Sequence, residues 1–101
     1  MTFYFYMKKP CVYILSNPLH TVLYVGVTSD IEQRIVQHKN HTFGGFSAKY
    51  NLTQLLYVEE FCSMAEAIAR EKQIKSWSRK RKDELIATVN PFLLDLMEGN
   101  E

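Results

Sequence analysis

The fold is decided by residues 11–27, CVYILSNPLHTVLYVGV, which hold two short runs rich in β-branched and aromatic side chains. Such runs are typical of strands, so we predict one strand over residues 11–16 and a second over residues 22–27. The segment Asn17-Pro18-Leu19-His20 between them has the composition of a turn, because proline presets its φ and asparagine favours the opening position. The sequence therefore predicts an antiparallel hairpin.

The centre of this hairpin determines which side chains meet. A turn centred on Pro18-Leu19 would place Tyr13 directly opposite Tyr24, with both rings on one face of the sheet. Two strand tyrosines are also consistent with ordinary packing at the edge of a core, with their hydroxyls in water. A catalytic phenol needs a nearby cation or metal, because its ordinary pKa of about 10 leaves it almost wholly un-ionised at pH 7.

A helix is predicted after the hairpin. Ser29-Asp30-Ile31-Glu32 matches a capping box in which Ser29 caps the helix, and we expect the helix to reach about Asn40. Arg34 and His38 are four residues apart and therefore share a helical face. The planar guanidinium of Arg34 fits phosphate oxygens, although a solvated helix arginine is the common alternative. His38 can bind phosphate or transfer a proton; with His41 it would suggest zinc, but no third ligand follows at a useful spacing.

The remaining elements follow from their apolar runs and capping residues. Residues 54–61 read as a third strand; Ser63 opens a helix to about Trp77, and Ser78 opens another through Val89. The expected order is ββα-β-αα, which is an α+β fold with a three-stranded sheet and helices covering one face or both. Residues 41–50 between the first helix and the third strand form a loop with paired glycines.

Glu71 is the carboxylate that stands out on the helix after Ser63. It falls on the apolar stripe formed by Met64, Ala67, Ile68 and Ile74. An inward carboxylate is costly unless it is paired or holds a cation. Glu71 is therefore either a metal ligand or a member of a buried ion pair with Arg34 or a helix neighbour. Magnesium is chemically suitable because it often takes one or two protein carboxylates and completes its shell with water and substrate phosphate oxygens.

Length, charge and cysteine usage limit the possible classes of protein. The 101 residues make one domain, residues 1–101, with its core at about residues 10–91. Two cysteines predict no disulfide scaffold and a reducing cytoplasmic setting, and no apolar run approaches the roughly 20 residues that span a bilayer. Residues 1–9 lack the order of a signal peptide. We expect no membrane association and no organic cofactor.

Positive charge is concentrated in one part of an otherwise nearly neutral chain. The net charge is +1, yet residues 72–82 contain Lys72 and Lys75 followed by a run of four basic residues. These residues and Lys49, beside the paired glycines, are candidates for phosphate contacts, although such a run is usually a solvated helix face. Binding to DNA by this domain alone should therefore be weak and sensitive to salt.

Taken together, these residues resemble the GIY-YIG endonuclease superfamily. Val12-Tyr13-Ile14 stands where the first motif would be, and Tyr24-Val25-Gly26 stands where the second would be. Arg34, His38, Glu71 and Asn90 follow at the places where the family has its arginine, its histidine or tyrosine, its metal-binding glutamate and its late asparagine. The resemblance covers about residues 10–91, and the chain looks most like small stand-alone bacterial members related to the nuclease domain of the excision-repair incision subunit.

The resemblance implies a three-stranded antiparallel sheet flanked by helices and a DNA endonuclease or nickase, with DNA repair or processing as its setting. It also implies one divalent metal, Mg²⁺ or Mn²⁺, and hydrolysis that leaves a 5′-phosphate and a 3′-hydroxyl. In this chain the resemblance implies that Tyr24 activates water, with Tyr13 as neighbour or alternative base, and that Arg34 stabilises the developing charge. It implies that His38 transfers a proton or binds phosphate and that Glu71 binds the metal. Gly26 would allow close backbone approach, and Asn90 would orient a neighbour or strand.

Two positions depart from the family pattern. Val12 replaces the glycine of the first motif, which concerns backbone packing, and Val27 stands where some members carry a basic residue. Val27 removes one candidate for activating the nucleophile. A non-catalytic nucleic-acid-binding module with the same fold is therefore the alternative, as is a subunit that depends on a protein partner for targeting.

Overall fold

The computed structural model describes residues 8–40 and 49–97, and within these ranges the chain forms the predicted order of strands and helices. The elements are β1 (Cys11–Ser16), β2 (Leu23–Thr28), α1 (Ile31–Lys39), β3 (Gln54–Glu60), α3 (Met64–Lys75) and α4 (Arg79–Ala87). The glycine-rich part of the predicted loop, residues 41–48, lies outside the described residues. No helix of the described part is long and apolar enough to cross a membrane.

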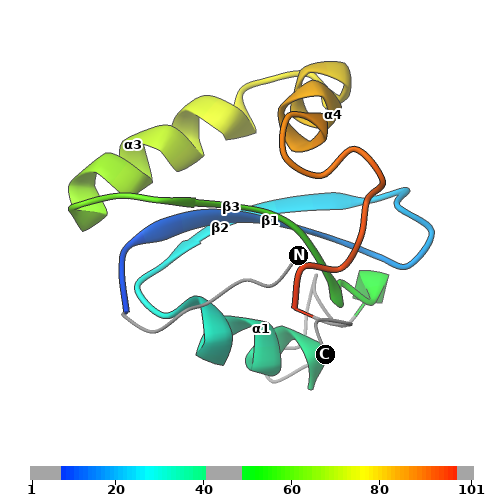
Figure 1. Ribbon diagram of the computed structural model, residues 1–101, viewed down its shortest axis with the longest axis horizontal. Helices are drawn as coiled ribbons and strands as arrows, with labels where there is room; N and C mark the ends of the chain where they lie inside the picture. Colours follow the sequence, from blue (N-terminus) through cyan, green and yellow to red (C-terminus); the bar gives the residue numbers. More distant parts are fainter. Residues whose placement is uncertain (1–7, 41–48, 98–101) are drawn as a thin grey trace.

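The sheet is a central layer with helices on both of its faces. Its strand order is β2-β1-β3, and β1 pairs antiparallel with both neighbours. Helix α1 covers one face, while α3 and α4 lie over the other (Figure 1). The predicted α+β class and three-stranded antiparallel sheet are confirmed. Every residue of β1 is buried, because this strand has a strand on each side and helices above and below it.

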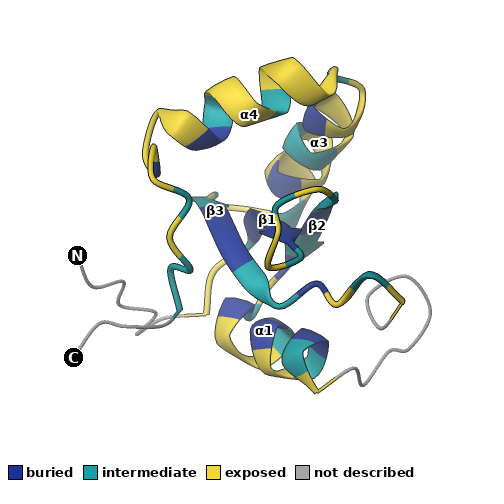
Figure 2. Cartoon of the chain, turned by 90° about the vertical axis from the view of Figure 1, so that its right-hand side faces the viewer, coloured by how far each residue is buried: buried dark blue, intermediate teal, exposed yellow. Residues whose placement is uncertain are grey.

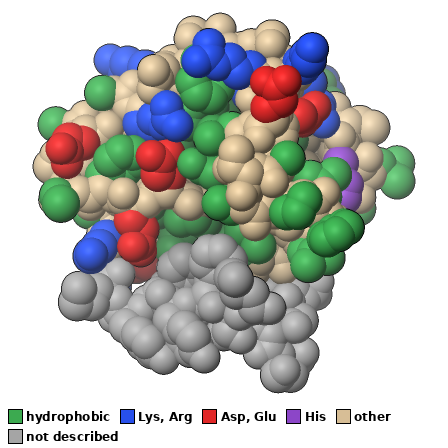
Figure 3. All heavy atoms as spheres, turned by 45° about the horizontal axis from the view of Figure 1, so that its top comes forward, with side chains coloured by type: hydrophobic (Ala, Val, Ile, Leu, Met, Phe, Trp, Pro, Cys, Tyr) green, Lys and Arg blue, Asp and Glu red, His purple; other side chains and the backbone are tan. Residues whose placement is uncertain are grey.

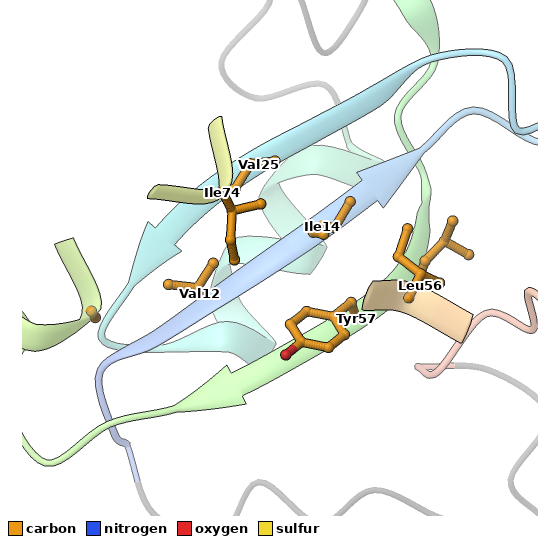
Figure 4. Packing of buried hydrophobic residues seen from close by; sticks show 8 residues of the cluster. Val12, Ile14, Val25, Leu56, Tyr57 and Ile74 are labelled. Atoms are coloured by element: carbon orange, nitrogen blue, oxygen red, sulfur yellow. The ribbon is translucent and has the colours of Figure 1, made fainter. Parts of the chain in front are cut away.

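Alternating side chains of the strands form two apolar clusters, one on each face. The cluster under α3 and α4 is built on Val12, Ile14 and Val25, against which Ile74 of α3 packs (Figure 4). The cluster on the α1 side is built on Cys11, Tyr13, Leu15, Ile31, Ile35, Leu52 and Leu55. Figure 2 shows the same division, since the buried side of each helix is the side that meets the sheet. Tyr13, the tyrosine of β1, belongs to the cluster on the α1 side.

The hairpin register differs from the predicted one by two residues. Tyr13 pairs with Gly26, and Tyr24 pairs with Leu15. The reason is a longer loop: the Asn17 side-chain oxygen accepts hydrogen bonds from the backbone N–H groups of Thr21 and Val22, both at 2.9 Å, so strand pairing begins only at Leu23. A shift of two residues preserves the alternation of faces. The predicted shared face of Tyr13 and Tyr24 is therefore confirmed although their direct pairing was wrong.

The helix caps were predicted with one error. Asp30 caps α1 instead of Ser29, with its carboxylate accepting a hydrogen bond from the backbone N–H of Gln33 at 3.3 Å. The Thr28 hydroxyl accepts from the Asp30 N–H at 3.1 Å and so fixes the extended backbone that a cap residue needs. Ser63 and Ser78 cap α3 and α4 as predicted.

Asn90 ties the segment after α4 to the sheet. A bulge in β3 opposite Ile14 and Leu15 separates Leu55 from Tyr57, and the carbonyl of the intervening Leu56 accepts a hydrogen bond from Asn90 Nδ2 at 3.0 Å. The same amide donates to the Leu94 carbonyl at 2.8 Å and accepts from the Leu94 N–H at 3.0 Å. Asn90 is 4% exposed, so water does not replace these bonds easily. Asn90 therefore joins β3 to the segment after α4.

We predict that Asn90→Ala lowers the free energy of unfolding by about 2–3 kcal/mol, because a buried carbonyl loses its partner. Asn17→Ala is the matched control, since the Asn17 side chain also makes three hydrogen bonds but in a turn that water reaches. Its cost should be about 1 kcal/mol or less. Chemical denaturation of both variants measures the difference, and equal costs would show that the burial of Asn90 does not matter.

Candidate active site

Four of the predicted site residues lie together on the α1 face of the sheet. Tyr13 of β1 and Tyr24 of β2 have ring centroids 6.2 Å apart. The His38 ring of α1 lies 6.0 Å from the Tyr13 ring and 5.6 Å from the Tyr24 ring. Arg34 Nη1 donates a hydrogen bond to the Tyr13 hydroxyl at 3.4 Å, and that hydroxyl lies 3.3 Å from His38 Nε2. Two phenols, a guanidinium and an imidazole therefore form one contiguous cluster.

The sequence of α1 explains how the helix presents these groups. Ile31, Ile35 and His38 are spaced at i, i+4 and i+7, so they form one stripe, and all three are buried against the sheet. Arg34 directly precedes Ile35 and is half-buried at the flank of this stripe. The apolar anchors thus set the rotation of the helix, and this rotation directs His38 inward and leaves Arg34 between the core and solvent.

Gly26 makes room for the Tyr13 ring. Gly26 is the cross-strand partner of Tyr13, and a Cβ at this position would lie 2.5 Å from both Cζ and the hydroxyl oxygen of Tyr13. The ring therefore lies across the glycine, where any other residue would displace it. The expected close approach at Gly26 is made in this structure by the chain's own tyrosine.

The two tyrosines have different surroundings. Tyr13 is fully buried, and this burial, with a smaller contribution from the neighbouring Tyr24, raises the pKa of Tyr13 to about 12 despite the opposing effect of Arg34. At pH 7 a phenol with that pKa is ionised in only about one molecule in 10⁵. Tyr24 is half-buried on an edge strand. Tyr13 is therefore unsuited to act as a base, whereas Tyr24 stands where water can approach.

His38 is held in its neutral form. The residue is 4% exposed, and its burial, reinforced by the nearby positive charge of Arg34, lowers the pKa of His38 below its ordinary value. A guanidinium has no acceptor, so the Tyr13 oxygen accepts from Arg34; the same hydroxyl is hydrogen-bonded to His38 Nε2, and the tautomer of the imidazole sets which of the two groups donates. A neutral imidazole can take up a proton, which is the property that general acid–base chemistry requires.

Glu71 lies in the opposite layer. It belongs to α3, its side chain is only 14% exposed, and its carboxylate forms an ion pair with Lys75 one turn later at 3.2 Å. The inward orientation is as predicted, although Ile68 of the same predicted stripe is 37% exposed. Helix α3 contacts β2 and β1 from the face opposite to the four-residue cluster. Within the described residues no group of three potential ligands (His, Cys, Asp or Glu) gathers around a common point.

The candidate phosphate-binding lysines are spread over the surface. Lys72 and Lys75 lie on α3, and the Lys75 ammonium is already engaged with Glu71. Lys49 lies 5.4 Å from the centre of the Tyr50 ring. Figure 3 shows lysine and arginine side chains distributed over the α3 and α4 side with acidic side chains between them. The mixture of signs agrees with the nearly neutral net charge.

Two side chains near the site were not predicted as part of it. Asp95 lies after α4 and forms an ion pair with Lys39, the last residue of α1, at 3.2 Å. The available signal in the sequence was a single acid within the apolar run of residues 92–97. Its partner could not be found from sequence, because 56 positions separate Lys39 from Asp95.

Most of the chain matches one known protein family. The model of the GIY-YIG catalytic domain matches residues 9–84. The chain belongs to the GIY-YIG family. This match includes both tyrosines, Arg34, His38 and Glu71 and ends before Asn90 and Asp95.

Individual relatives of this GIY-YIG protein extend over nearly the same region. A UPF0213 protein of Staphylococcus saprophyticus is 44% identical over 85 residues, which cover 80% of this chain and 98% of the relative. A UPF0213 protein of Natronomonas pharaonis is 39% identical over 75% of this chain and 88% of its own length. The solution NMR structure of a UPF0213 protein from Bacillus halodurans matches with a TM-score of 0.53 at 27% identity, covering 81% of this chain and 86% of that one.

Membership in the GIY-YIG family places the protein in a nuclease superfamily and implies DNA as the class of substrate. The names of these three relatives state no activity. Within the motifs, the valine at position 12 has a physical explanation. Val12 is fully buried in the cluster beneath α3 and α4, where its side chain contributes apolar contact that glycine would not.

We predict that Gly26→Ala destabilises this GIY-YIG domain by about 1–3 kcal/mol, because the added methyl group forces the Tyr13 ring to move. The same substitution should cost much less in a Tyr13→Leu background, since the shorter side chain lacks the ring atoms that clash. A double-mutant cycle of unfolding free energies measures this coupling. Additive costs would show that the ring does not lie across Gly26.

We also predict that Tyr13 titrates late in alkaline solution. The folded pKa of about 12 exceeds the ordinary value of 10, so the folded chain keeps a proton that the unfolded chain loses. Stability should therefore fall between pH 10 and 12, by about 1.4 kcal/mol per pH unit for each such tyrosine. Tyr57, whose pKa burial also raises to about 12, behaves likewise. Tyrosinate absorbance will show one fewer late-titrating group in Tyr13→Phe; an unchanged late phase would contradict the assignment.

Proposed function

We propose that this protein is a DNA endonuclease that hydrolyses or nicks phosphodiester bonds with the help of Mg²⁺ or Mn²⁺. The observation that carries the proposal is the cluster of Tyr13, Tyr24, Arg34 and His38, in which a permanent cation and a neutral imidazole meet a phenol on the edge strand. Family membership supports a nuclease, and the arrangement of these side chains supports the particular chemistry.

The proposed step is attack of a water oxygen on the phosphorus atom with cleavage of the bond to the 3′ oxygen. Tyr24 takes a proton from the attacking water as its own phenolic proton passes to neutral His38, whose ring centroid lies 5.6 Å from that of Tyr24. The departing 3′ oxygen takes a proton from solvent, so the products carry a 5′-phosphate and a 3′-hydroxyl. Arg34 stabilises the negative charge that develops on the phosphate oxygens, which is often the largest single contribution to such catalysis.

Tyr13 supports this chemistry without reacting. Its raised pKa excludes it as the base, and its hydroxyl joins Arg34 to His38. In this role the hydroxyl fixes the direction of the guanidinium and the orientation of the imidazole ring. The division of roles between the two tyrosines thus follows from their burial.

Glu71 is the residue we propose for the metal. It is an inward-facing carboxylate paired with a single exchangeable cation, Lys75, and a divalent ion can replace that ammonium. One carboxylate fits magnesium, which completes its shell with waters and substrate phosphate oxygens. When bound, the ion supplies positive charge to the phosphate and the leaving oxygen. Lys49 and Lys72 are proposed to contact neighbouring phosphates, and Lys75 to join them when Glu71 binds the metal.

A non-catalytic DNA-binding module is the second candidate, and Val27 is the observation that favours it. Val27 packs against the cluster beneath α3 and α4 at the place where some family members carry a basic residue. No charged group at this position can then assist the nucleophile. Targeting by a protein partner is compatible with either candidate.

The test is cleavage of labelled single-stranded, duplex, nicked, flap and branched DNA with and without Mg²⁺ or Mn²⁺. We expect metal-dependent cleavage that Glu71→Gln abolishes and that Tyr24→Phe reduces by at least about 10²-fold. Glu66→Gln, an exposed glutamate on the same helix, and Tyr57→Phe, a buried tyrosine on the opposite face of the sheet, are matched controls that should retain activity. Binding without cleavage in the unmodified protein would favour the non-catalytic module, and normal cleavage by Glu71→Gln would overturn the metal assignment.

A further inference from the structure

The segment that follows α4 joins the two layers of the fold. Leu93 packs against the cluster beneath α3 and α4, whereas Leu96 and Met97 pack against the cluster on the α1 side. Between these anchors the segment hydrogen-bonds to the edge strand β3, with the Leu96 N–H donating to the Leu55 carbonyl at 2.8 Å. Residues 90–97 therefore run from one face of the sheet to the other beside β3. We call them the C-terminal strap.

Asp95 is the polar centre of the C-terminal strap. Its side chain is 6% exposed, and Oδ1 accepts hydrogen bonds from the Leu55 N–H at 3.1 Å and from the Met97 N–H at 3.2 Å. Oδ2 pairs with the Lys39 ammonium at 3.2 Å. A carboxylate this deeply buried is tolerated only when its oxygens are satisfied, and here both oxygens have partners. One side chain thus connects β3, the strap and α1.

The contact with α1 is made at the end of the helix that carries the cluster. Lys39 is the last residue of α1 and directly follows His38, whose ring is among the buried members of that helix. A helix of nine residues is marginal by itself and depends on tertiary contacts for its position. Ile31 and Ile35 fix its first two turns against the sheet. The third turn is held by the buried His38 ring and, at the end of the helix, by the Lys39–Asp95 ion pair.

We propose that Asp95 is a positioning residue for the active site, acting through Lys39 to hold the last turn of α1 and thereby His38 and Arg34 against the two tyrosines. This role rests on the proposed function of the cluster. Asp95 lies outside the region that matches the GIY-YIG catalytic domain, so the C-terminal strap supplies a contact that the matched region alone does not contain. Asp95 itself contacts neither Tyr13 nor Tyr24 in any described hydrogen bond, and its effect is transmitted through the helix.

The test uses Asp95→Asn and Lys39→Met in the full chain, with NMR readouts that do not depend on activity. Asp95→Asn keeps an oxygen for the two N–H donors and removes the charge that holds Lys39. In both variants we expect amide exchange of residues 34–39 to accelerate by about five-fold or more while the amides of β1 keep their protection. In Asp95→Asn the pKa of His38 should rise toward its ordinary value, because a loosened ring is better hydrated, whereas loss of the Asp95 charge alone would lower it. The double variant should add little to either single one.

Lys8→Met is the matched control. Lys8 forms an ion pair with Asp30 at the other end of α1, and its side chain is 79% exposed. This control should leave the exchange of residues 34–39 and the His38 titration unchanged, whereas Lys39→Arg should rescue both. Unaltered amide exchange and His38 titration in Asp95→Asn and Lys39→Met would overturn the positioning role. Equal acceleration of amide exchange throughout α1 and β1 would also overturn it, because it indicates a loss of global stability only. Should Asp95→Asn not fold, Lys39→Met alone decides, because Lys39 lies at the surface end of the contact.

Cleavage is measured in parallel on the DNA that the unmodified protein cuts. We expect kcat to fall by about five-fold or more in Asp95→Asn with KM little changed, since the strap makes no proposed DNA contact. If the unmodified protein cuts no DNA, the proposed function fails while the NMR comparison still decides whether Asp95 positions α1. A fall in kcat without any change at His38 would contradict the proposal.

Discussion

Tyr13 lies across Gly26 on the central strand, and the candidate site is arranged around this one contact. The ring fits because its cross-strand partner has no side chain, and the hydroxyl is consequently carried into the interior on the α1 face. A buried phenol is costly unless its hydroxyl is hydrogen-bonded. Helix α1 meets that requirement, because Arg34 and His38 both hydrogen-bond to the Tyr13 hydroxyl. A cation and an imidazole therefore lie together on the α1 face of the sheet.

Local patterns predicted most of the fold, and contacts across the fold account for what they missed. β1 was predicted with its observed bounds, and the capping serines of α3 and α4 were found because a cap is encoded within four residues. The register of the hairpin was missed because the Asn17 side chain lengthens the loop, which composition does not reveal. Ser29 was predicted as the cap because a capping residue followed three positions later by Glu or Gln occurs twice, as Ser29 with Glu32 and as Asp30 with Gln33. The hydrogen bond from the Asp30 N–H to the Thr28 hydroxyl, which fixes Asp30 as the cap, cannot be read from this pattern.

The candidate site could be predicted only as a set of residue types. Spacing placed Tyr13 and Tyr24 on one face and Arg34 and His38 on one helical face, and the structure brings these four together. The unequal burial of the tyrosines could not be foreseen, since it depends on which strand is central. Asp95 could not be foreseen either, because its partner Lys39 is remote in sequence. For Glu71 the sequence left a metal or an ion pair open, and the structure shows an ion pair with Lys75.

The two edges of the sheet differ, and this difference bears on where a substrate can be handled. The C-terminal strap hydrogen-bonds to β3, whereas in the described ranges no strand pairs with the outer side of β2. Arg34 and His38 approach from one face and Glu71 belongs to the helix on the other, so a phosphate that engages both must do so around a sheet edge. Tyr24 lies on β2 and is half-buried, at the edge that both α3 and the cluster adjoin. On the proposed assignment, the open edge at β2 is the reaction site, and the closed edge at β3 supplies the rigidity that keeps α1 in place.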